Sequence, residues 1–297
     1  MALFECRSLT KKIGTYGLAD IDFDLEGGTI LGLIGINGCG KTTLLRTILG
    51  SYRIDTDEEN TGELILNGHH CLRDQKQYRN DIAYVLQECP FNENMHAGEV
   101  GERYGYYYRD FNKSRYFALL GEYGIHPKKG LSELSKGQVM KMQLAFAQSY
   151  QASLYIFDEP AGNLDVHFRD EFYELLRKLV SDEKHAVIIS SHLVSELEHI
   201  ADELLWMGRE EERGFVRFKG SIDDLKNDYR LLSADKDEEK DIPEDMIAGK
   251  RIRASHCEYL LCKKGVEFDK ALPEDMVKKL VFPALQEIMY YVEKKEA

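Results

Sequence analysis

Short apolar runs alternate with amphipathic segments along the first 220 residues of the chain. Residues 18–25 alternate apolar and acidic positions, which predicts a strand with one exposed face. Residues 29–34 are continuously apolar, which predicts a strand buried on both faces. Further strands are predicted at 63–66, 82–86, 153–157, 186–189, 204–207 and 214–218, and helices at 41–49 and 168–180. Strands that alternate with helices indicate an α/β fold.

Two stretches depart from this alternation. Residues 88–137 are rich in aromatic and poor in β-branched residues, which predicts an inserted helical subdomain. Seven acidic residues within 235–245 indicate an exposed loop or linker. The segment at 250–262 predicts a strand pair, and the segment at 276–293 predicts a helix that is interrupted at Pro283. We therefore expect a main domain over residues 1–220 and a small C-terminal extension over residues 221–297.

A glycine-rich segment, GINGCGKTT at residues 35–43, joins the predicted strand at 29–34 to the predicted helix at 41–49. This context is typical of a phosphate-binding loop, in which glycines let backbone N–H groups approach phosphate oxygens. The helix N-terminus adds the positive end of its dipole. Lys41 is expected to reach the β- and γ-phosphates and Thr42 to ligate Mg²⁺. The predicted nucleotide contacts in this loop are Asn37, Gly38, Cys39, Gly40, Lys41, Thr42 and Thr43.

A second motif follows about 120 residues later, where the apolar run at 154–157 ends in Asp158 and Glu159. Asp158 is expected to help hold Mg²⁺, and Glu159 to orient and activate a water molecule for attack on the γ-phosphate. An acidic pair at a strand end is common. The separation from the phosphate loop permits contact between the two motifs without requiring it.

Five motifs, taken in order, resemble those of the ATP-binding subunits of ABC transporters. The sequence LSKGQ at 134–138 is similar to the LSGGQ signature of that family, with Lys136 in place of its first glycine. The other four are Gln87 (the glutamine loop), Asp158-Glu159 (Walker B), AGNLD at 161–165 (the D-loop) and His192 (the switch histidine). The resemblance covers residues 3 to about 220. It implies a P-loop NTPase core with an antiparallel β subdomain and an inserted helical subdomain.

The resemblance also implies a site that two chains complete. Two such domains are expected to pair head to tail, as a homodimer or a heterodimer, with two ATP molecules between them. The phosphate loop of one chain and Ser135, Gly137 and Gln138 of the other would hold each ATP. Asp165 is expected to cross the interface and to couple the two sites.

The roles implied for the catalytic residues are specific. Glu159 is expected to act as the general base, and His192 to contact the γ-phosphate and help position the water. With Lys41 these residues form the predicted catalytic set. Gln87 is expected to contact Mg²⁺ beside Thr42 and Asp158, and to relay the state of the site to the helical subdomain.

The base-binding position departs from the family pattern. The family places an aromatic residue some two dozen residues before the phosphate loop, and Ile13 occupies that place in this chain. Either Ile13 packs on the base, or nearby Tyr16 reaches it through a shifted turn. We favour Ile13, so base recognition is expected to be weak. Within the loop, the helix N-terminus and Lys41 are expected to favour the thiolate of Cys39.

Charge and composition restrict the partners. A net charge of -13 argues against binding to nucleic acid, which requires clustered Lys and Arg. No apolar run approaches the ~18 residues that span a bilayer, and no secretory signal is visible. The six cysteines form no CxxC pair, which favours reduced thiols. His256, Cys257 and Cys262 are too few for a typical four-ligand metal site.

With a single nucleotide-binding unit, the chain is expected to be a cytoplasmic ATPase subunit that serves a separate permease on the inner face of the cell membrane. The signature variant, the Ser-Ser-His sequence at 190–192 and residues 282–289 resemble exporter ATPases of the drug- and bacteriocin-resistance type. The alternative is a cytosolic ATPase that acts as a clamp or regulator on a soluble partner, which the segment 221–297 would bind.

Aromatic residues beside Gln87 suggest where a permease would dock. Five aromatic residues within 104–111 cannot all face one core on a single helix, because successive residues turn by about 100°. We expect a groove lined by Phe91, Met95 and part of this cluster to receive a cytoplasmic helix of the permease. Phe91 and Tyr107 are expected among its exposed members.

Overall fold

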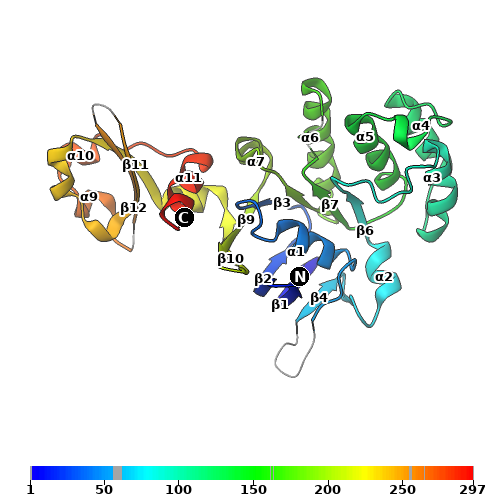
Figure 1. Cartoon of the computed structure of the whole chain (residues 1–297), viewed down its shortest axis with the longest axis horizontal. Helices are drawn as coiled ribbons and strands as arrows, with labels where there is room; N and C mark the ends of the chain where they lie inside the picture. Colours follow the sequence, from blue (N-terminus) through cyan, green and yellow to red (C-terminus); the bar gives the residue numbers. More distant parts are fainter. Residues whose placement is uncertain are drawn as a thin grey trace. The chain divides into compact units, whose positions relative to one another are not determined.

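The computed structural model describes residues 2–55, 62–160, 162, 164–253, 256–263 and 265–296. The chain separates into two units (Figure 1). Residues 1–193 and 200–219 form the first unit, and residues 194–199 and 220–297 form the second.

A ten-stranded sheet is the framework of the first unit, with the strand order β5-β4-β1-β2-β10-β9-β3-β8-β7-β6. Its antiparallel part consists of β1 (Phe4–Ile13), β2 (Tyr16–Leu25), β4 (Glu63–Leu66) and β5 (His69–His70). Its parallel part consists of β3 (Ile30–Ile34), β6 (Ile82–Val85), β7 (Leu154–Asp158), β8 (Ala186–Ser190) and β9 (Glu203–Glu210). Strand β10 (Arg213–Ser221) lies between the two parts and pairs with β2 in parallel.

The buried strands lie where the continuous apolar runs predicted them. Every residue of β3, β7 and β8 is buried, because sheet neighbours flank each of these strands and helices cover the sheet. The associated helices of the first unit are α1 (Lys41–Ile48), α2 (Gln75–Asn80) and α6 (Val166–Val180), whereas nearly all of α7 (Val194–Ile200) belongs to the second unit. The α/β class and the antiparallel β subdomain are therefore confirmed.

The inserted subdomain contains α3 (Ala97–Tyr104), α4 (Lys113–Glu122) and α5 (Lys136–Ala147), grouped at the right of Figure 1, with the short 3-10 helices η1 (Gly105–Tyr107) and η2 (Leu131–Glu133). Phe146 of α5 is the centre of its core. The rings of Phe91, Tyr108, Phe111, Tyr116 and Tyr150 lie 5.1–5.9 Å from its ring centroid. Most of the aromatic cluster thus fills this core.

Phe91, predicted to be exposed, and Met95, predicted to line the docking groove, both need correction. Phe91 and Met95 are buried, because Phe91 packs against Tyr104 and Phe146. The exposed members are Tyr106 and Tyr107, at 89% and 72% exposure, because the chain leaves α3 and turns through η1. Part of the aromatic cluster is thus exposed, as expected, and Tyr107 is among the exposed residues.

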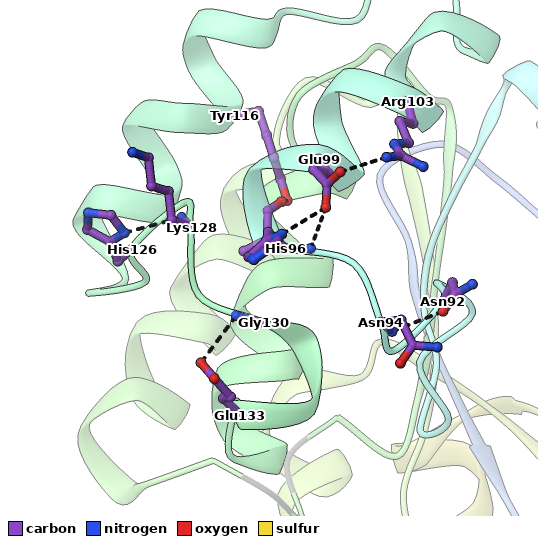
Figure 2. A network of polar contacts seen from close by, with 11 residues as sticks. Asn92, Asn94, His96, Glu99, Arg103, Tyr116, His126, Lys128, Gly130 and Glu133 are labelled. Atoms are coloured by element: carbon purple, nitrogen blue, oxygen red, sulfur yellow. Dashed lines mark hydrogen bonds and ion pairs between the residues drawn. The ribbon is translucent and has the colours of Figure 1, made fainter.

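Polar contacts fix the entrance of α3 (Figure 2). The backbone N–H of His96 donates to the Glu99 carboxylate at 2.8 Å, and Arg103 donates to it at 2.7 Å. The His96 N–H lowers the pKa of Glu99 to about 2. His96 also forms a β-bridge with Gly130, whose N–H donates to Glu133 at 3.3 Å. The segment that leads into α5 is thereby held against α3.

The second unit is built on the three-stranded sheet β11-β13-β12. Its elements are α8 (Ile222–Asn227), β11 (Tyr229–Ala234), β12 (Ile247–Ile252), β13 (Cys257–Cys262), α9 (Phe268–Ala271), α10 (Glu274–Val277) and α11 (Leu285–Glu296). The predicted strand pair corresponds to β12 and β13, and the predicted helix is divided into α10 and α11, with Pro283 between them.

The acidic segment at 235–245 differs from the exposed loop that its charge indicated. It contains η4 (Lys236–Asp241) and leads into η5 (Glu244–Met246). Ile242 and Met246 are buried in the core of the second unit, together with Leu232, Tyr259 and Phe268. Two apolar residues among the acidic ones are enough to attach the segment to the sheet.

Candidate nucleotide-binding and catalytic site

The phosphate loop opens onto a cavity of about 400 Å³. Lys41 lies at its base, where its Nζ donates to the carbonyl oxygens of Gly35 at 2.7 Å and Ile36 at 3.2 Å. Helix α1 begins at Lys41 and directs its first N–H groups to the same side. The lining residues are Tyr16, Asn37, Gly38, Gly40, Lys41, Thr42, Thr43, Glu159 and Arg209. This set of N–H groups, hydroxyls and cations suits a polyphosphate.

The acidic pair lies at the end of β7, and Ser190 at the end of the adjacent strand β8 holds both residues. The Ser190 hydroxyl donates to Asp158 Oδ1 at 2.7 Å, and the backbone N–H of Glu159 donates to Ser190 Oγ at 3.0 Å. Glu159 has φ +51°, a conformation that disfavours non-glycine residues. Burial raises the pKa of Asp158. Ser190 is therefore a positioning residue for the Asp158 carboxylate and for the backbone of Glu159.

The sequence analysis matched Ser190 only as part of the Ser-Ser-His sequence and gave it no role. A signal for this role was nevertheless present. The segments at 153–157 and 186–189 both have the continuous apolar pattern of buried strands, which is typical of parallel sheets, and the carboxyl ends of neighbouring parallel strands meet at one edge of the sheet.

Glu159 and His192, which were predicted from separate motifs, form a contact. His192 Nδ1 lies 2.6 Å from Glu159 Oε1. The Glu159 side chain is 17% exposed and lines the phosphate-loop cavity, whereas the His192 side chain is 55% exposed. A carboxylate at this place is able to accept a proton from a water molecule in the cavity, and His192 is able to orient that carboxylate.

The residues predicted for Mg²⁺ fit a hard divalent cation. Thr42 lines the phosphate-loop cavity, and Gln87 lines a cavity of about 160 Å³ with Asp158 and Glu159. In the described part of the chain, no group of three or more His, Cys, Asp or Glu residues is placed to hold a metal. One carboxylate with hydroxyl and amide oxygens suits Mg²⁺, which also takes phosphate ligands. When bound, Mg²⁺ would neutralise charge on the phosphates.

Cys39 differs from its expected environment. Its side chain is fully buried in the core of the first unit, next to Gly35, and does not point into the cavity. Packing against apolar neighbours has determined the direction of this side chain. An alkylating reagent therefore has no access to Sγ while the loop keeps this conformation, contrary to the expectation of a reactive thiolate.

Ile13 and Tyr16 occupy opposite positions across the β1–β2 hairpin. Tyr16 lines the cavity, and its hydroxyl is buried without a hydrogen-bond partner among the described residues. Burial raises the pKa of Tyr16 to about 12. Ile13 is 40% exposed, and the cavity lining in the described chain does not include it. The choice of Ile13 as the base contact stays a prediction.

The signature residues form the N-terminus of α5. Ser135 caps this helix, since its Oγ accepts the backbone N–H of Gln138 at 3.2 Å, and Gln138 Oε1 accepts from the N–H of Ser135 at 3.3 Å. Asp165 caps α6 by accepting from Phe168 N–H at 2.9 Å. Ala161 and Asn163 of the D-loop lie outside the described residues.

Within the described chain, seven predicted nucleotide contacts do not line the phosphate-loop cavity: Ile13, Cys39, Gln87, Ser135, Gly137, Gln138 and Asp165. One chain thus brings together the phosphate loop, the acidic pair, Gln87 and His192. Leu134 and Lys136 of the signature motif line the smaller cavity beside Gln87, Asp158 and Glu159, whereas Ser135, Gly137, Gln138 and Asp165 line neither cavity in the described chain.

The fold and this site define a P-loop ATPase. The family model for ABC transporters matches residues 18–162. The chain carries an ABC transporter ATP-binding domain, and this domain hydrolyses ATP. ATPase subunits of this family dimerise and work with membrane permease subunits.

The chain is also similar to individual ATP-binding proteins of ABC transporters. The chain is 27% identical over 228 residues to the ABC transporter ATP-binding protein YtrB of Bacillus subtilis, covering 76% of this chain and 75% of YtrB. It is 31% identical over 220 residues to the molybdenum import ATP-binding protein ModC of Rhodobacter capsulatus, covering 71% of this chain and 57% of ModC. A solved ATP-binding subunit of an ABC transporter has the same fold, with a TM-score of 0.66 and 24% identity over 76% of this chain and 92% of the other.

Across the ranges that the structure describes, none of the helices combines the length and apolar character that crossing a bilayer requires.

Replacing Ser190 with alanine is expected to lower kcat about tenfold to a hundredfold while changing KM for ATP little. A hydrogen bond to a charged group contributes about 1.5–3 kcal/mol, and its loss frees the Asp158 carboxylate and removes the bond to the Glu159 backbone N–H. Steady-state ATPase kinetics measure the effect. Ser190→Thr should restore activity, because threonine keeps the hydroxyl. Ser191→Ala is the control, since the Ser191 hydroxyl accepts the N–H of Leu193 instead. An unchanged kcat in Ser190→Ala would contradict the positioning role of Ser190.

Proposed function

We propose that this chain is the ATP-hydrolysing subunit that energises a separate membrane permease. In this proposal the chain is cytoplasmic and lies on the inner face of the cell membrane through that permease. The observation that carries the proposal is a groove of about 680 Å³ between the nucleotide-binding core and the helical subdomain.

The groove is chemically mixed. Its lining combines Lys76 and Arg79 of α2, both exposed, with four tyrosines and several aliphatic residues. The full lining is Leu49, Gly50, Ser51, Lys76, Arg79, Asn80, Ile82, Tyr84, Leu86, Pro90, Tyr104, Tyr107 and Tyr108. An amphipathic helix with an apolar face suits such a groove, and exposed tyrosines are frequent at protein interfaces.

A short stretch of backbone joins this groove to the catalytic carboxylates. Leu86 lines the groove, and the next residue, Gln87, lines the cavity beside Asp158 and Glu159. The Gln143 side chain holds Leu86 through two hydrogen bonds to its backbone, of 3.1 and 3.0 Å. A shift of Gln87 on ATP binding would therefore move one wall of the groove. This connection is the support for coupling hydrolysis to a docked helix.

We further propose that two chains pair so that the signature motif of one completes the ATP site of the other. The support is the position of Ser135, Gly137 and Gln138 outside the phosphate-loop cavity of their own chain. The proposed direction of transport is export, supported by the signature variant with Lys136 and by residues 282–289. The relative ModC is named as an import protein, so similarity alone does not decide the direction.

The Tyr107→Glu variant tests docking. Tyr107 lines the groove at 72% exposure, so the substitution should abolish co-purification of a multi-span membrane protein from detergent-solubilised membranes. ATP binding and thermal stability should persist. Tyr106→Glu is the matched control, because Tyr106 is 89% exposed but does not line the groove in the described chain.

Mass spectrometry of the co-purified proteins separates the possible outcomes. A multi-span protein lost only with Tyr107→Glu supports the proposal. A multi-span protein retained by both variants places the docking surface elsewhere. A soluble protein that co-purifies in place of a membrane protein would favour the clamp or regulator function.

A further inference from the structure

Arg209 lies against the phosphate loop although no motif includes it. It is near the end of β9, which pairs with β3 in parallel through Trp206 and Ile34, so the chain beyond Trp206 runs beside the start of the loop. The Arg209 Nη1 atom lies 2.9 Å from the position that a Cβ on Gly38 would take. Arg209 also lines the 400 Å³ cavity.

Two contacts hold the guanidinium in this place. Its Nε donates to the carbonyl oxygen of Glu211 at 2.9 Å, which fixes the side chain to its own hairpin. Its Cζ lies 5.6 Å from the centroid of the Tyr16 ring, within the range of a cation–π contact. Across the described residues, Nη1 and Nη2 form no ion pair with a carboxylate. The face of the guanidinium that carries these donors is therefore available to a ligand.

The charges around the cavity favour an anionic ligand at this position. Lys41 donates to two carbonyl oxygens of the loop, and Glu159, the one carboxylate in the described lining, pairs with His192. Arg209 thus adds a second cation to the cavity. The planar fork of a guanidinium matches two phosphate oxygens, a geometry that an ammonium group does not offer.

We propose that Arg209 is a further nucleotide-binding residue, which contacts the phosphate chain of ATP while the Tyr16 ring supports its guanidinium. The contact is to phosphate because the guanidinium lies at Gly38, within the phosphate loop. Arg213 of the same hairpin provides a comparison. Arg213 is also exposed, but its backbone pairs with Gly17 and its side chain is absent from the cavity lining in the described chain.

The test measures the affinity of the full chain for Mg-ATP and Mg-GTP by calorimetry. Arg209→Ala should lower the affinity for both nucleotides by the same factor, roughly tenfold to a hundredfold, because a contact to phosphate does not depend on the base. Arg209→Lys should recover part of the loss, since it keeps the charge without the fork. Arg213→Ala should bind as the wild type does. Thermal melting confirms that each variant is folded.

Two results would overturn the proposal. Wild-type affinity for ATP in Arg209→Ala would show that the guanidinium does not contact the nucleotide. A loss confined to one of the two nucleotides would assign Arg209 to the base, because adenine and guanine offer different hydrogen-bonding edges to arginine. Tyr16→Leu removes the supporting ring, so it should also lower the affinity for both nucleotides, by a smaller factor than Arg209→Ala.

Discussion

Replacing Glu159 with glutamine is expected to slow ATP hydrolysis about 10²–10⁴-fold and to preserve ATP binding. Glutamine has nearly the same size, so the backbone contact to Ser190 should remain. It cannot accept a proton from the attacking water, and it loses the ion pair with His192. If two chains close around ATP as proposed, the variant should also remain dimeric on a sizing column with Mg-ATP. Steady-state ATPase assays and calorimetry measure the first two effects.

A control variant must separate the loss of the carboxylate from the effect of substituting a residue whose backbone has a positive φ. Glu183 suits this purpose, because it also has a positive φ, +58°, and is exposed in a loop away from the cavity. Glu183→Gln should keep the wild-type rate. A wild-type rate in Glu159→Gln would mean that another group accepts the proton, and His192 would then be the next residue to test.

The features predicted best from the sequence are those that a short segment determines by itself. The continuous apolar run at 29–34 required burial on both faces, and β3 is buried at every residue. The phosphate loop required a strand before it and a helix after it, and β3 and α1 provide them. Pro283 interrupts the helical pattern at 276–293, and α11 begins at Leu285, just after it, whereas the helix before it is shorter than expected because α10 ends at Val277.

The features that the sequence did not reveal depend on packing between distant segments. The direction of the Cys39 side chain follows from the core around Gly35 and β9, and not from the charge of the loop. Ser190 and Arg209 acquire roles because β8 and β9 pair with neighbours far along the chain. Hydrophobicity alone likewise did not distinguish the buried Phe91 from the exposed Tyr107.

Replacing Gly35 with alanine is expected to destabilise the first unit by roughly 2–6 kcal/mol and to abolish ATP binding. Gly35 has φ +146°, and a Cβ there would lie 2.4 Å from the carbonyl oxygen of Met207 and 2.6 Å from Cys39 Sγ. The first of these atoms is backbone in β9 and cannot rotate away. Lys41 donates to the carbonyl oxygen of Gly35, so a displaced Gly35 also displaces the ammonium group.

A second glycine separates crowding from conformational strain in this test. Gly14 also has a positive φ, +62°, but a Cβ there would meet no atom within 4 Å. Gly14→Ala should therefore cost only about 1–2 kcal/mol of left-handed strain and leave ATP binding intact. Thermal melting and calorimetry compare the two variants. Equal losses of stability in the two variants would mean that the positive φ alone requires glycine at position 35. A larger loss in Gly35→Ala would show that the phosphate loop depends on close backbone contact with β9, the strand that also carries Arg209.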